Sequence, residues 1–478
     1  MKVWLINPRT EGMIATELPG FVSREIGRFP PLGLLYLAAS LRQVGGHDVR
    51  IFDMPAQDLS YAALADALRQ ERPGLVGITA ITHNLVEVLR TAECVKQAAP
   101  ATHVCLGGPH VNVFPAESLA LAPVDSTVWG EGEDVFPRLV EAVASGRAPS
   151  DLPGVSWKVN GQIRLASGPA PATEDLDRLP LPARDLVEGR DYFYVLGRRA
   201  TFTTILSSRG CPYRCVFCST PRGRCRLHSP ARVVDEMSAC LKAGAEEIHF
   251  VDDTFNTVRG RLAAISREIL NRGMRVRWSI RARINTIEDE DLRLARQAGC
   301  VRVHFGVETG TDEGLRMLRK DLTTTRIEEV FRAVRRCGLV SVAYFLMGCP
   351  HEKTPADVIR TLDFACRLDP DFAMFNILTI YPGTELFDMA VARGLIEKDY
   401  WSEFVRRPDP GFRLRFWQES FTAAELDAFL RLAYRRFYFR PRVLWRNLRD
   451  IGSLEALRHK MAAALSMFVG GKDRAGSP

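Results

Sequence analysis

The stretch RGCPYRCVFCST, residues 209–220, places three cysteines in a C-x-x-x-C-x-x-C pattern, directly after a predicted strand at 203–209. Gly210 and Pro212 indicate that the cysteines lie in a loop. Three thiolates spaced in this way, Cys211, Cys215 and Cys218, can bind three irons of one cubane cluster. Most four-iron clusters take four cysteine ligands, so the fourth iron here would keep a coordination site for a substrate or cofactor.

A structural zinc site is the main alternative for these thiols. Such a site takes four ligands, and the nearby Cys225 or His228 could supply the fourth. A chance group of thiols is the other alternative, but the position of the loop after a strand favours a metal site over chance.

Six strand–helix units follow one another from residue 201 onward. Strands are predicted at 203–209, 247–253, 276–283, 301–308, 340–348 and 373–381, and helices near 230–243, 259–272, 288–298, 312–318, 325–337 and 355–367. This alternation predicts a partial or complete parallel barrel. Functional groups should then gather at the carboxyl ends of its strands.

The first 150 residues show a second alternation. Apolar runs at 3–7, 48–53, 75–82, 102–108 and 126–133 predict strands, and amphipathic stretches at 30–45, 61–73 and 85–100 predict helices. Unalternating apolar strands between helices predict a doubly wound, Rossmann-like parallel sheet. Ligands of such sheets bind beyond the carboxyl ends of the strands. The residues expected at that edge are Thr79, Gly107, Gly108, His110, Gly130, Glu131 and Gly132.

The domain organisation follows from these two alternations. We expect a Rossmann-like domain at 1–150, a linker at 151–200, a barrel at 201–400 and a helical region at 401–478. The linker contains a short strand pair around 155–165 and a proline-rich segment at 168–186. The tail at 433–452 interleaves aromatic residues with arginines.

Composition excludes several protein classes. The chain has 478 residues, of which 46% are hydrophobic and 25% charged, so neither a disordered chain nor a membrane-spanning one is expected. The net charge of +7 is spread along the sequence, which favours a solvated surface over a nucleic-acid partner. No secretion signal is recognisable, and eleven cysteines then point to reduced thiols in the cytoplasm.

The cysteine motif, with Phe217 before its third cysteine, resembles that of the radical S-adenosylmethionine (SAM) superfamily. The order of domains over residues 1–400 resembles the cobalamin-dependent branch of that superfamily. The resemblance implies a 4Fe–4S cluster, SAM and cobalamin as cofactors. It also implies SAM contacts from Asp252 or Asp253 in VDDTF (251–255), from Glu308, and from Arg281 and Arg283. Gly348 and Pro350 are expected to shape the adenine pocket, although a plain turn explains them almost as well.

The segments PPLGLLYLAASLR and LGGPH resemble the cobalamin-binding module of this branch. The chain has no D-x-H-x-x-G motif, so the usual histidine ligand to cobalt is not supplied. His110 lies in the right loop but is not expected to be a cobalt ligand. The resemblance then implies methyl transfer without a lower histidine ligand.

Three functions are compatible with this reading. The first is methylation of an unactivated carbon of a secondary metabolite, lipid or tetrapyrrole. The second is oxidation or ring formation, as in the anaerobic magnesium-protoporphyrin ester cyclase, and the third is a non-catalytic cobalamin sensor or carrier. The enzymatic functions require a small-molecule or lipid substrate and an electron donor of the flavodoxin or ferredoxin type. The basic, aromatic tail is expected either to contact the inner face of a membrane peripherally or to cap the barrel.

Overall fold

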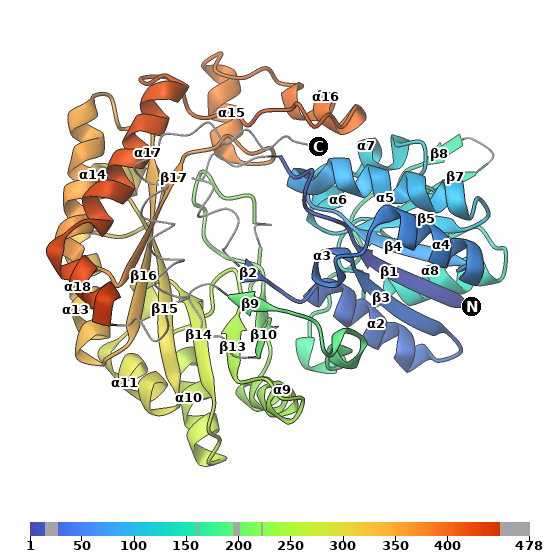
Figure 1. The fold of residues 1–478 in the computed structure, drawn as a ribbon, viewed down its shortest axis with the longest axis horizontal. Helices are drawn as coiled ribbons and strands as arrows, with labels where there is room; N and C mark the ends of the chain where they lie inside the picture. The colour runs from blue at the N-terminus through green and yellow to red at the C-terminus, as the bar shows by residue number, and fades with distance from the viewer. Residues whose placement is uncertain (15–26, 160–161, 195–200, 221–222, 450–478) are drawn as a thin grey trace.

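The structure is a computed structural model and describes residues 1–14, 27–159, 162–194, 201–220 and 223–449. Two α/β units lie next to each other (Figure 1), one formed by the N-terminal residues and one by residues beyond 200. Their strands form a seven-stranded sheet and a six-stranded sheet. Both units therefore have the fold class that the sequence predicts.

The N-terminal sheet has the strand order β3-β1-β4-β5-β6-β7-β8. Its strands are β1 (Lys2–Asn7), β3 (Asp48–Asp53), β4 (Leu75–Thr79), β5 (His103–Gly107), β6 (Ser126–Val128), β7 (Val155–Val159) and β8 (Gln162–Arg164). The first five pair in parallel, whereas β7 and β8 add an antiparallel hairpin to the edge at β6. The order of the parallel strands reverses at β1, and doubly wound sheets bind their ligands at such a point.

Helices cover both faces of this sheet. They are α2 (Leu32–Val44), α3 (Met54–Gln57), α4 (Tyr61–Glu71), α5 (Leu85–Ala98), α6 (Pro109–Val113), α7 (Pro115–Ala120) and α8 (Val135–Ala144). Along β1, Val3 and Leu5 belong to the core under α2 and α8, and Trp4 and Ile6 to the core under α4 and α5. Because both faces are buried, the strands read as continuous apolar runs.

The second sheet consists of six parallel strands that pair in sequence order. They are β10 (Phe202–Ile205), β13 (Glu247–Phe250), β14 (Arg277–Ala282), β15 (Cys300–Glu308), β16 (Val340–Met347) and β17 (Phe372–Ile377). The sheet curves into a partial barrel with its helices outside (Figure 1). The helices are α9 (Pro230–Lys242), α10 (Arg261–Asn271), α11 (Asp289–Gln297), α12 (Asp312–Met317), α13 (Thr324–Arg336) and α14 (Pro355–Leu368).

Two short antiparallel ribbons complete the described strands. The ribbon of β11 (Ser208–Arg209) and β12 (Arg226–Leu227) brackets the cysteine motif, and the ribbon of β2 (Gly27–Arg28) and β9 (Phe193–Tyr194) lies between the two units. The predicted strand at 203–209 is therefore split into β10 and β11, because the chain leaves the barrel sheet after Ile205.

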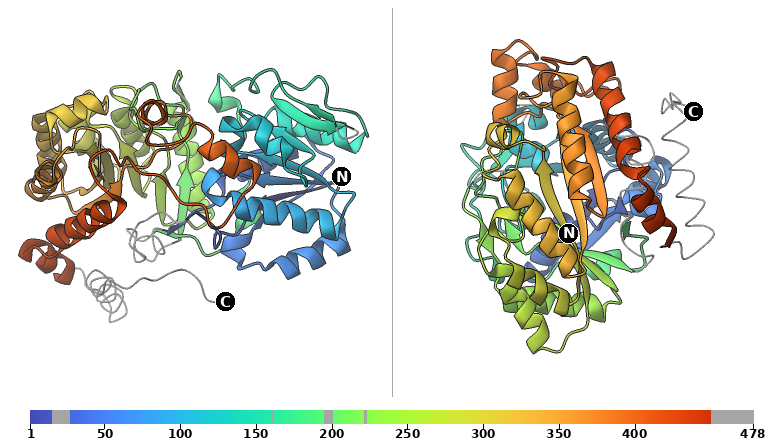
Figure 2. Two further views of the ribbon diagram at one scale, coloured as in Figure 1. Left: turned by 90° about the horizontal axis from the view of Figure 1, so that it is seen from above. Right: turned by 90° about the vertical axis from the view of Figure 1, so that its left-hand side faces the viewer.

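The C-terminal region contains α15 (Glu385–Ala392), α16 (Tyr400–Arg406), α17 (Ala423–Tyr438) and α18 (Pro441–Arg449). Helix α17 packs along the outside of β17 (Figure 2), and its Tyr434 and Tyr438 hydroxyls bond the backbone of Phe375 and Ala373. Part of the aromatic tail therefore covers the last barrel strand, while residues 450–478 lie outside the described residues. In the described chain no helix combines the length and apolarity needed to cross a bilayer.

Candidate functional site

The three-cysteine loop (residues 209–220) lies at the carboxyl end of β10, where a parallel barrel collects its functional groups. Its backbone is held at Val216, whose amide donates to Leu318 O and whose carbonyl accepts from the Leu386 amide. Cys215 is buried, and Cys211 and Cys218 are partly exposed. Since Leu318 and Leu386 follow β15 and β17, the loop is fixed by the barrel itself.

The residues that could complete a zinc site point elsewhere. Cys225 Sγ lies 3.2 Å from Thr257 Oγ1, and His228 Nδ1 lies 3.1 Å from Asp177 Oδ1. Within the described ranges, no three histidine, cysteine or acidic side chains are close enough together to hold a single metal ion. The donor set of the loop is thus three thiols with no fourth cysteine or histidine, which fits a cluster with one open iron better than tetrahedral zinc.

Arg283, which follows β14, contacts this loop directly. Its guanidinium carbon lies 3.6 Å from the centre of the Tyr213 ring, and Nη1 lies 3.6 Å from Cys215 Sγ. Its Nη2 donates to the carbonyl of Lys320. The resemblance implies that Arg283 pairs with the SAM carboxylate, and it gives no sign of this contact with Cys215.

The two aspartates after β13 differ in their surroundings. Asp252 is fully buried and accepts hydrogen bonds from the Ser207 and Ser208 hydroxyls, while burial raises its pKa. Asp253 lies against the three-cysteine loop, with its Oδ1 3.5 Å from Thr220 Oγ1, and burial raises its pKa as well. Asp253 therefore faces the loop, and Asp252 supports the strand ends beneath it.

Glu308 closes β15 in a strained conformation. Its φ of 68° lies in the left-handed region, which costs a non-glycine residue on the order of 1–2 kcal/mol and is common at functional sites. Its carboxylate is buried and pairs with Lys320 Nζ at 2.8 Å. A Cβ on Gly306 would lie 2.3 Å from Glu308 Oε1, so the glycine makes room for this carboxylate.

The loop after β16 is closed by the C-terminal region. Gly348 has a φ of 74°, and a Cβ there would lie 2.6 Å from Leu426 of α17. Beneath it, Glu352 accepts a hydrogen bond from the Cys349 amide, and burial raises the pKa of Glu352 to about 7. Arg281 is exposed on β14, on the same face of the strand as Arg283.

An apolar pocket of about 240 Å³ lies between the three-cysteine loop and the C-terminal region. It is lined by Phe217, by residues at the ends of β16 and β17, and by Leu414, Phe416 and Leu430. The C-terminal residues carry no motif and could not be found from the sequence. They belong to the site because the chain after β17 returns across the barrel, with Phe416 bridging to Thr379.

A second cavity, of about 340 Å³, lies at the carboxyl edge of the N-terminal sheet. Six of the seven residues predicted for this edge line it, namely Thr79, Gly107, Gly108, Gly130, Glu131 and Gly132. Such a volume is in the range of small-molecule pockets. A Cβ on Gly107 would meet nothing within 4 Å, so the absence of a side chain there adds open space for a ligand.

His110 is the seventh predicted residue and does not line this cavity. Its ring is fully buried, its Nδ1 lies 3.0 Å from Thr82 Oγ1, and burial lowers its pKa to about 4. It belongs to the packing of α6, next to Phe114. His110 therefore lies beside the predicted cobalamin edge but not in the lining of its cavity.

The cavity lies between the two units, because Leu206, Arg209 and Val251 of the barrel also line it. Arg209 and Arg226 on the β11–β12 ribbon form ion pairs with Glu131 and Glu133 of the N-terminal unit. Arg209 immediately precedes the three-cysteine loop. The glycine-rich edge and the cysteine loop are thus joined by partly buried charged pairs.

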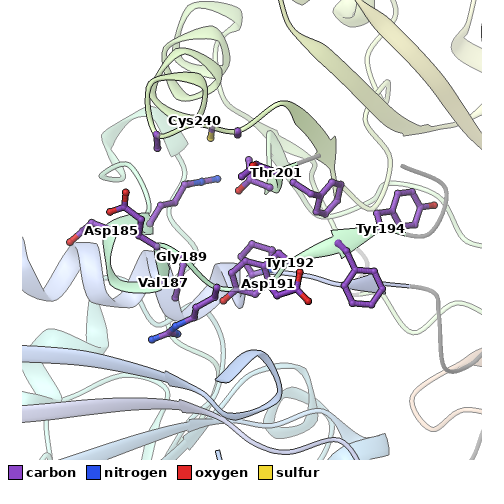
Figure 3. Close-up of a pocket in the computed structure, with 17 residues that line it drawn as sticks. Asp185, Val187, Gly189, Asp191, Tyr192, Tyr194, Thr201 and Cys240 are labelled. Carbon is purple, nitrogen blue, oxygen red and sulfur yellow. The ribbon is translucent and has the colours of Figure 1, made fainter. Parts of the chain in front are cut away.

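A cavity of about 860 Å³ lies beside the connector between the two units (Figure 3). It is lined by Tyr192 and Tyr194 of the connector and by Thr201 and Phe202 at the start of β10. These residues mark the amino end of the barrel. Because parallel barrels carry their active sites at the carboxyl end, we do not assign this cavity to catalysis.

Comparison with known proteins identifies two domain families along the chain. The family models for the B12 binding domain and for the Radical SAM superfamily match residues 26–140 and 205–365, respectively. An uncharacterised methyltransferase of Pyrococcus horikoshii is 35% identical over 94% of this chain and 95% of its own length. The anaerobic magnesium-protoporphyrin IX monomethyl ester cyclase of Rubrivivax gelatinosus is 30% identical over 76% of this chain and 66% of its own.

Solved structures show the same fold. The radical SAM methyltransferase TsrM of Kitasatospora setae, solved with cobalamin and a [4Fe–4S] cluster, superposes with a TM-score of 0.73. The match covers 97% of this chain and 99% of that one at 21% identity. The N-terminal sheet, the barrel and the C-terminal region of this chain therefore share the fold of that structure.

Proposed function

Because the chain belongs to the cobalamin-binding branch of the radical SAM superfamily, we propose that it methylates an unactivated carbon of a small molecule. The observation that carries this proposal is the three-cysteine loop, whose first residue pairs with the glycine-lined edge of the N-terminal sheet. When bound, the cluster and SAM supply a 5′-deoxyadenosyl radical, and cobalamin supplies the methyl group.

Different residues of the chain would bind the cluster, bind SAM and orient these binding groups. We propose that Cys211, Cys215 and Cys218 hold the cluster and that Arg283 orients Cys215. Asp253, Arg281, Glu308 and Gly348 would contact SAM, since they lie at the carboxyl ends of successive barrel strands. Asp252 would act as a positioning residue, since its carboxylate bonds only Ser207 and Ser208 among the described side chains.

The cobalamin contacts would come from the edge of the N-terminal sheet. Thr79, Gly107, Gly108, Gly130, Glu131 and Gly132 line the cavity there. Small residues let a bulky ligand approach the backbone, and Glu131 ties that backbone to the barrel through Arg226. Water would be excluded by the apolar cavity residues, such as Leu37 and Phe136.

Anaerobic reconstitution with iron, sulfide and cobalamin tests this proposal. Purified protein given SAM and a one-electron reductant should form 5′-deoxyadenosine. With candidate substrates, a methyltransferase adds one CH2 unit from labelled SAM, whereas a cyclase adds oxygen from water or a new ring. Incorporation of oxygen or formation of a ring would assign the cyclase reaction in place of methylation. Absence of SAM cleavage would contradict both reactions.

Two partners are also proposed. The reaction needs one electron per cleaved SAM, which a flavodoxin or ferredoxin can deliver. Membrane contact would come from α18, where Leu444 and Trp445 are exposed beside Arg442. Flotation with anionic liposomes should recover the wild type, whereas Leu444→Glu/Trp445→Glu should stay unbound. Equal recovery of the two proteins contradicts the membrane contact.

A further inference from the structure

The upper part of the barrel interior is accessible to solvent, whereas its lower end is closed by buried side chains. Along β14 to β17 the residues that face the helices, such as Ala282, Phe305, Phe345 and Phe375, are buried. The alternate residues that face the interior are exposed or partly exposed, and they include Arg281, Gly306, Tyr344, Leu346, Met374 and Asn376. A closed barrel fills its interior with side chains. Here the upper interior is accessible instead.

Two histidines form the floor of this space. His249 on β13 is 0% exposed and His304 on β15 is 1% exposed, and their ring centres lie 5.2 Å apart. His249 Nδ1 lies 2.8 Å from Ser279 Oγ, and His304 Nδ1 lies 2.9 Å from the Tyr344 hydroxyl. Both Nε2 atoms are buried and have no hydrogen-bond partner in the described part of the chain. Leaving such an atom unpaired costs on the order of 1–3 kcal/mol, so a polar group placed beside either Nε2 atom would be favoured.

The charges around this floor are mainly positive. Arg302 pairs with Glu247 at 2.7 Å, and its Nη1 is also buried without a partner among the described residues. Arg277 lies 3.8 Å from the same carboxylate. Arg281 has no carboxylate within ion-pair distance in the described ranges. Arg277 and Arg302 therefore share the carboxylate of Glu247, and Arg281 adds a positive charge further along β14.

The histidines themselves are neutral. Burial, together with the charges of Arg281 and Arg302, lowers the pKa of His249 to about 3 and that of His304 well below its usual value. A neutral imidazole whose Nδ1 accepts from a hydroxyl carries its proton on Nε2 and can donate there. The hydroxyls of Ser279 and Tyr344 can each donate to or accept from the neighbouring Nδ1. With the proton on Nε2, the two rings would present two donors in a positive field.

We propose that His249 and His304, together with Arg302 and Tyr344, form a subsite inside the barrel that binds an anionic group of the substrate, a carboxylate or a phosphoryl group. The inference rests on the proposed function, because it assigns the substrate to the interior of the same barrel. Ser279 at the floor and Arg283 at the three-cysteine loop lie four residues apart on one strand face, or roughly 13 Å. A small molecule anchored at the floor therefore extends toward the loop.

Binding of simple probes to the reconstituted full-length protein tests this subsite. The anionic probes are phenyl phosphate and phenylacetate, the neutral match is phenylacetamide, and sodium chloride holds the ionic strength constant. We expect saturable stabilisation against heat by at least one anionic probe and none by phenylacetamide. The preferred anion distinguishes a phosphoryl from a carboxylate substrate.

The variants His249→Gln and His304→Gln should bind the preferred anion at least about tenfold more weakly, because a hydrogen bond to a charged group is lost. Tyr344→Phe keeps the ring and removes only the hydroxyl beside His304, so it should give a smaller loss. His103→Gln, in the N-terminal sheet, is the matched control and should bind like the wild type. Iron content and the visible spectrum verify that each variant keeps its cluster.

Three results would overturn the subsite: equal stabilisation by phenylacetamide, no stabilisation by either anion, or unchanged binding in both histidine variants. In the last two cases an ordered water would satisfy the imidazoles. SAM cleavage measured on the same samples is independent of these results. A wild type that binds the anion but does not cleave SAM contradicts the proposed function alone.

Discussion

Arg283 points its guanidinium at the sulfur of Cys215, with Nη1 and Sγ 3.6 Å apart. The side chain cannot move easily, because it stacks on Tyr213 and is bonded to the carbonyl of Lys320. Hydrogen bonds to the cysteine sulfurs are one of the factors that set the reduction potential of an iron–sulfur cluster. Arg283 therefore links β14 to the electronic properties of the proposed cluster.

Arg283→Met should lower the reduction potential of the cluster, because a positive donor to its sulfur is lost. The rate of SAM cleavage should fall by about 10- to 100-fold, as is typical when a residue that supports a metal ligand is lost. Redox titration followed by electron paramagnetic resonance measures the potential. Arg259→Met removes an exposed arginine and is the control. An unchanged potential in fully loaded Arg283→Met protein would contradict the assigned contact.

Gly107→Val should abolish cobalamin binding without loss of the fold. A Cβ at Gly107 meets no atom within 4 Å, so valine would occupy cavity space and not strain the sheet. The amount of cobalamin that remains after gel filtration is read from its visible absorption. Gly168→Val, at another glycine with free space, should bind like the wild type. Full binding by Gly107→Val would place the cofactor elsewhere.

Glu352→Gln should flatten the dependence of stability on pH. Burial raises the pKa of Glu352 to about 7 in the folded protein, so between about pH 4.5 and 7 the folded state holds a proton that the unfolded state has released. Stability should therefore fall as pH rises through this range, by up to about 3 kcal/mol. Thermal unfolding of the wild type and Glu352→Gln at several pH values measures the difference. If the stability of the wild type and of Glu352→Gln depended on pH in the same way, the raised pKa of Glu352 would be contradicted.

Glu131→Gln should weaken the contact between the two units. Burial alone would raise the pKa of Glu131, but the hydrogen bond from Arg226 and the charge of Arg209 lower it overall. The pair then stabilises the folded protein at neutral pH, by about 1 kcal/mol given its partial exposure, and this is lost as pH falls below about 4.5. Glu290→Gln, in an exposed pair with Arg293, is the control for urea unfolding. Equal stability of the two variants at neutral pH would contradict a stabilising role for the ion pairs of Glu131 with Arg209 and Arg226.

Much of the fold could be predicted because strands β1 and β3 to β6 and the six barrel strands are parallel and largely buried. These strands are apolar runs and the helices between them are amphipathic, so each element has a local signal. No local sequence pattern shows which strand the hairpin β7–β8 pairs with. The sequence placed this pair in the linker, and the structure adds it to the N-terminal sheet beside β6. Pairing between strands depends on contacts distant in sequence.

The site was predictable where a motif or a strand end marks it. The order of a B12-binding domain and a radical SAM domain is confirmed by the family models, and six of seven residues predicted for the cobalamin edge line one cavity. The pair of Glu308 with Lys320 and the contact of Leu426 with Gly348 were missed. These contacts join segments whose approach is set by the curvature of the barrel and by the return of α17.

The positive charge of the barrel interior could not be predicted from the sequence either. His249 and His304 look like ordinary core residues in the sequence, because each stands alone between apolar neighbours. Only the register of β13 to β16 brings them onto one interior face with Tyr344. The roles of the individual SAM and cobalamin contacts stay predictions that the variants above address.

The central claim is that Cys211, Cys215 and Cys218 hold a redox-active cluster that cleaves SAM. The most direct measurement compares anaerobically reconstituted wild type with the single Cys→Ser variants at these positions and with Cys337→Ser, at the end of α13, as control. We predict about four irons per chain and 5′-deoxyadenosine formation in the wild type and the control, and neither in the three loop variants. Zinc in place of iron, or full SAM cleavage by the loop variants, would contradict the account.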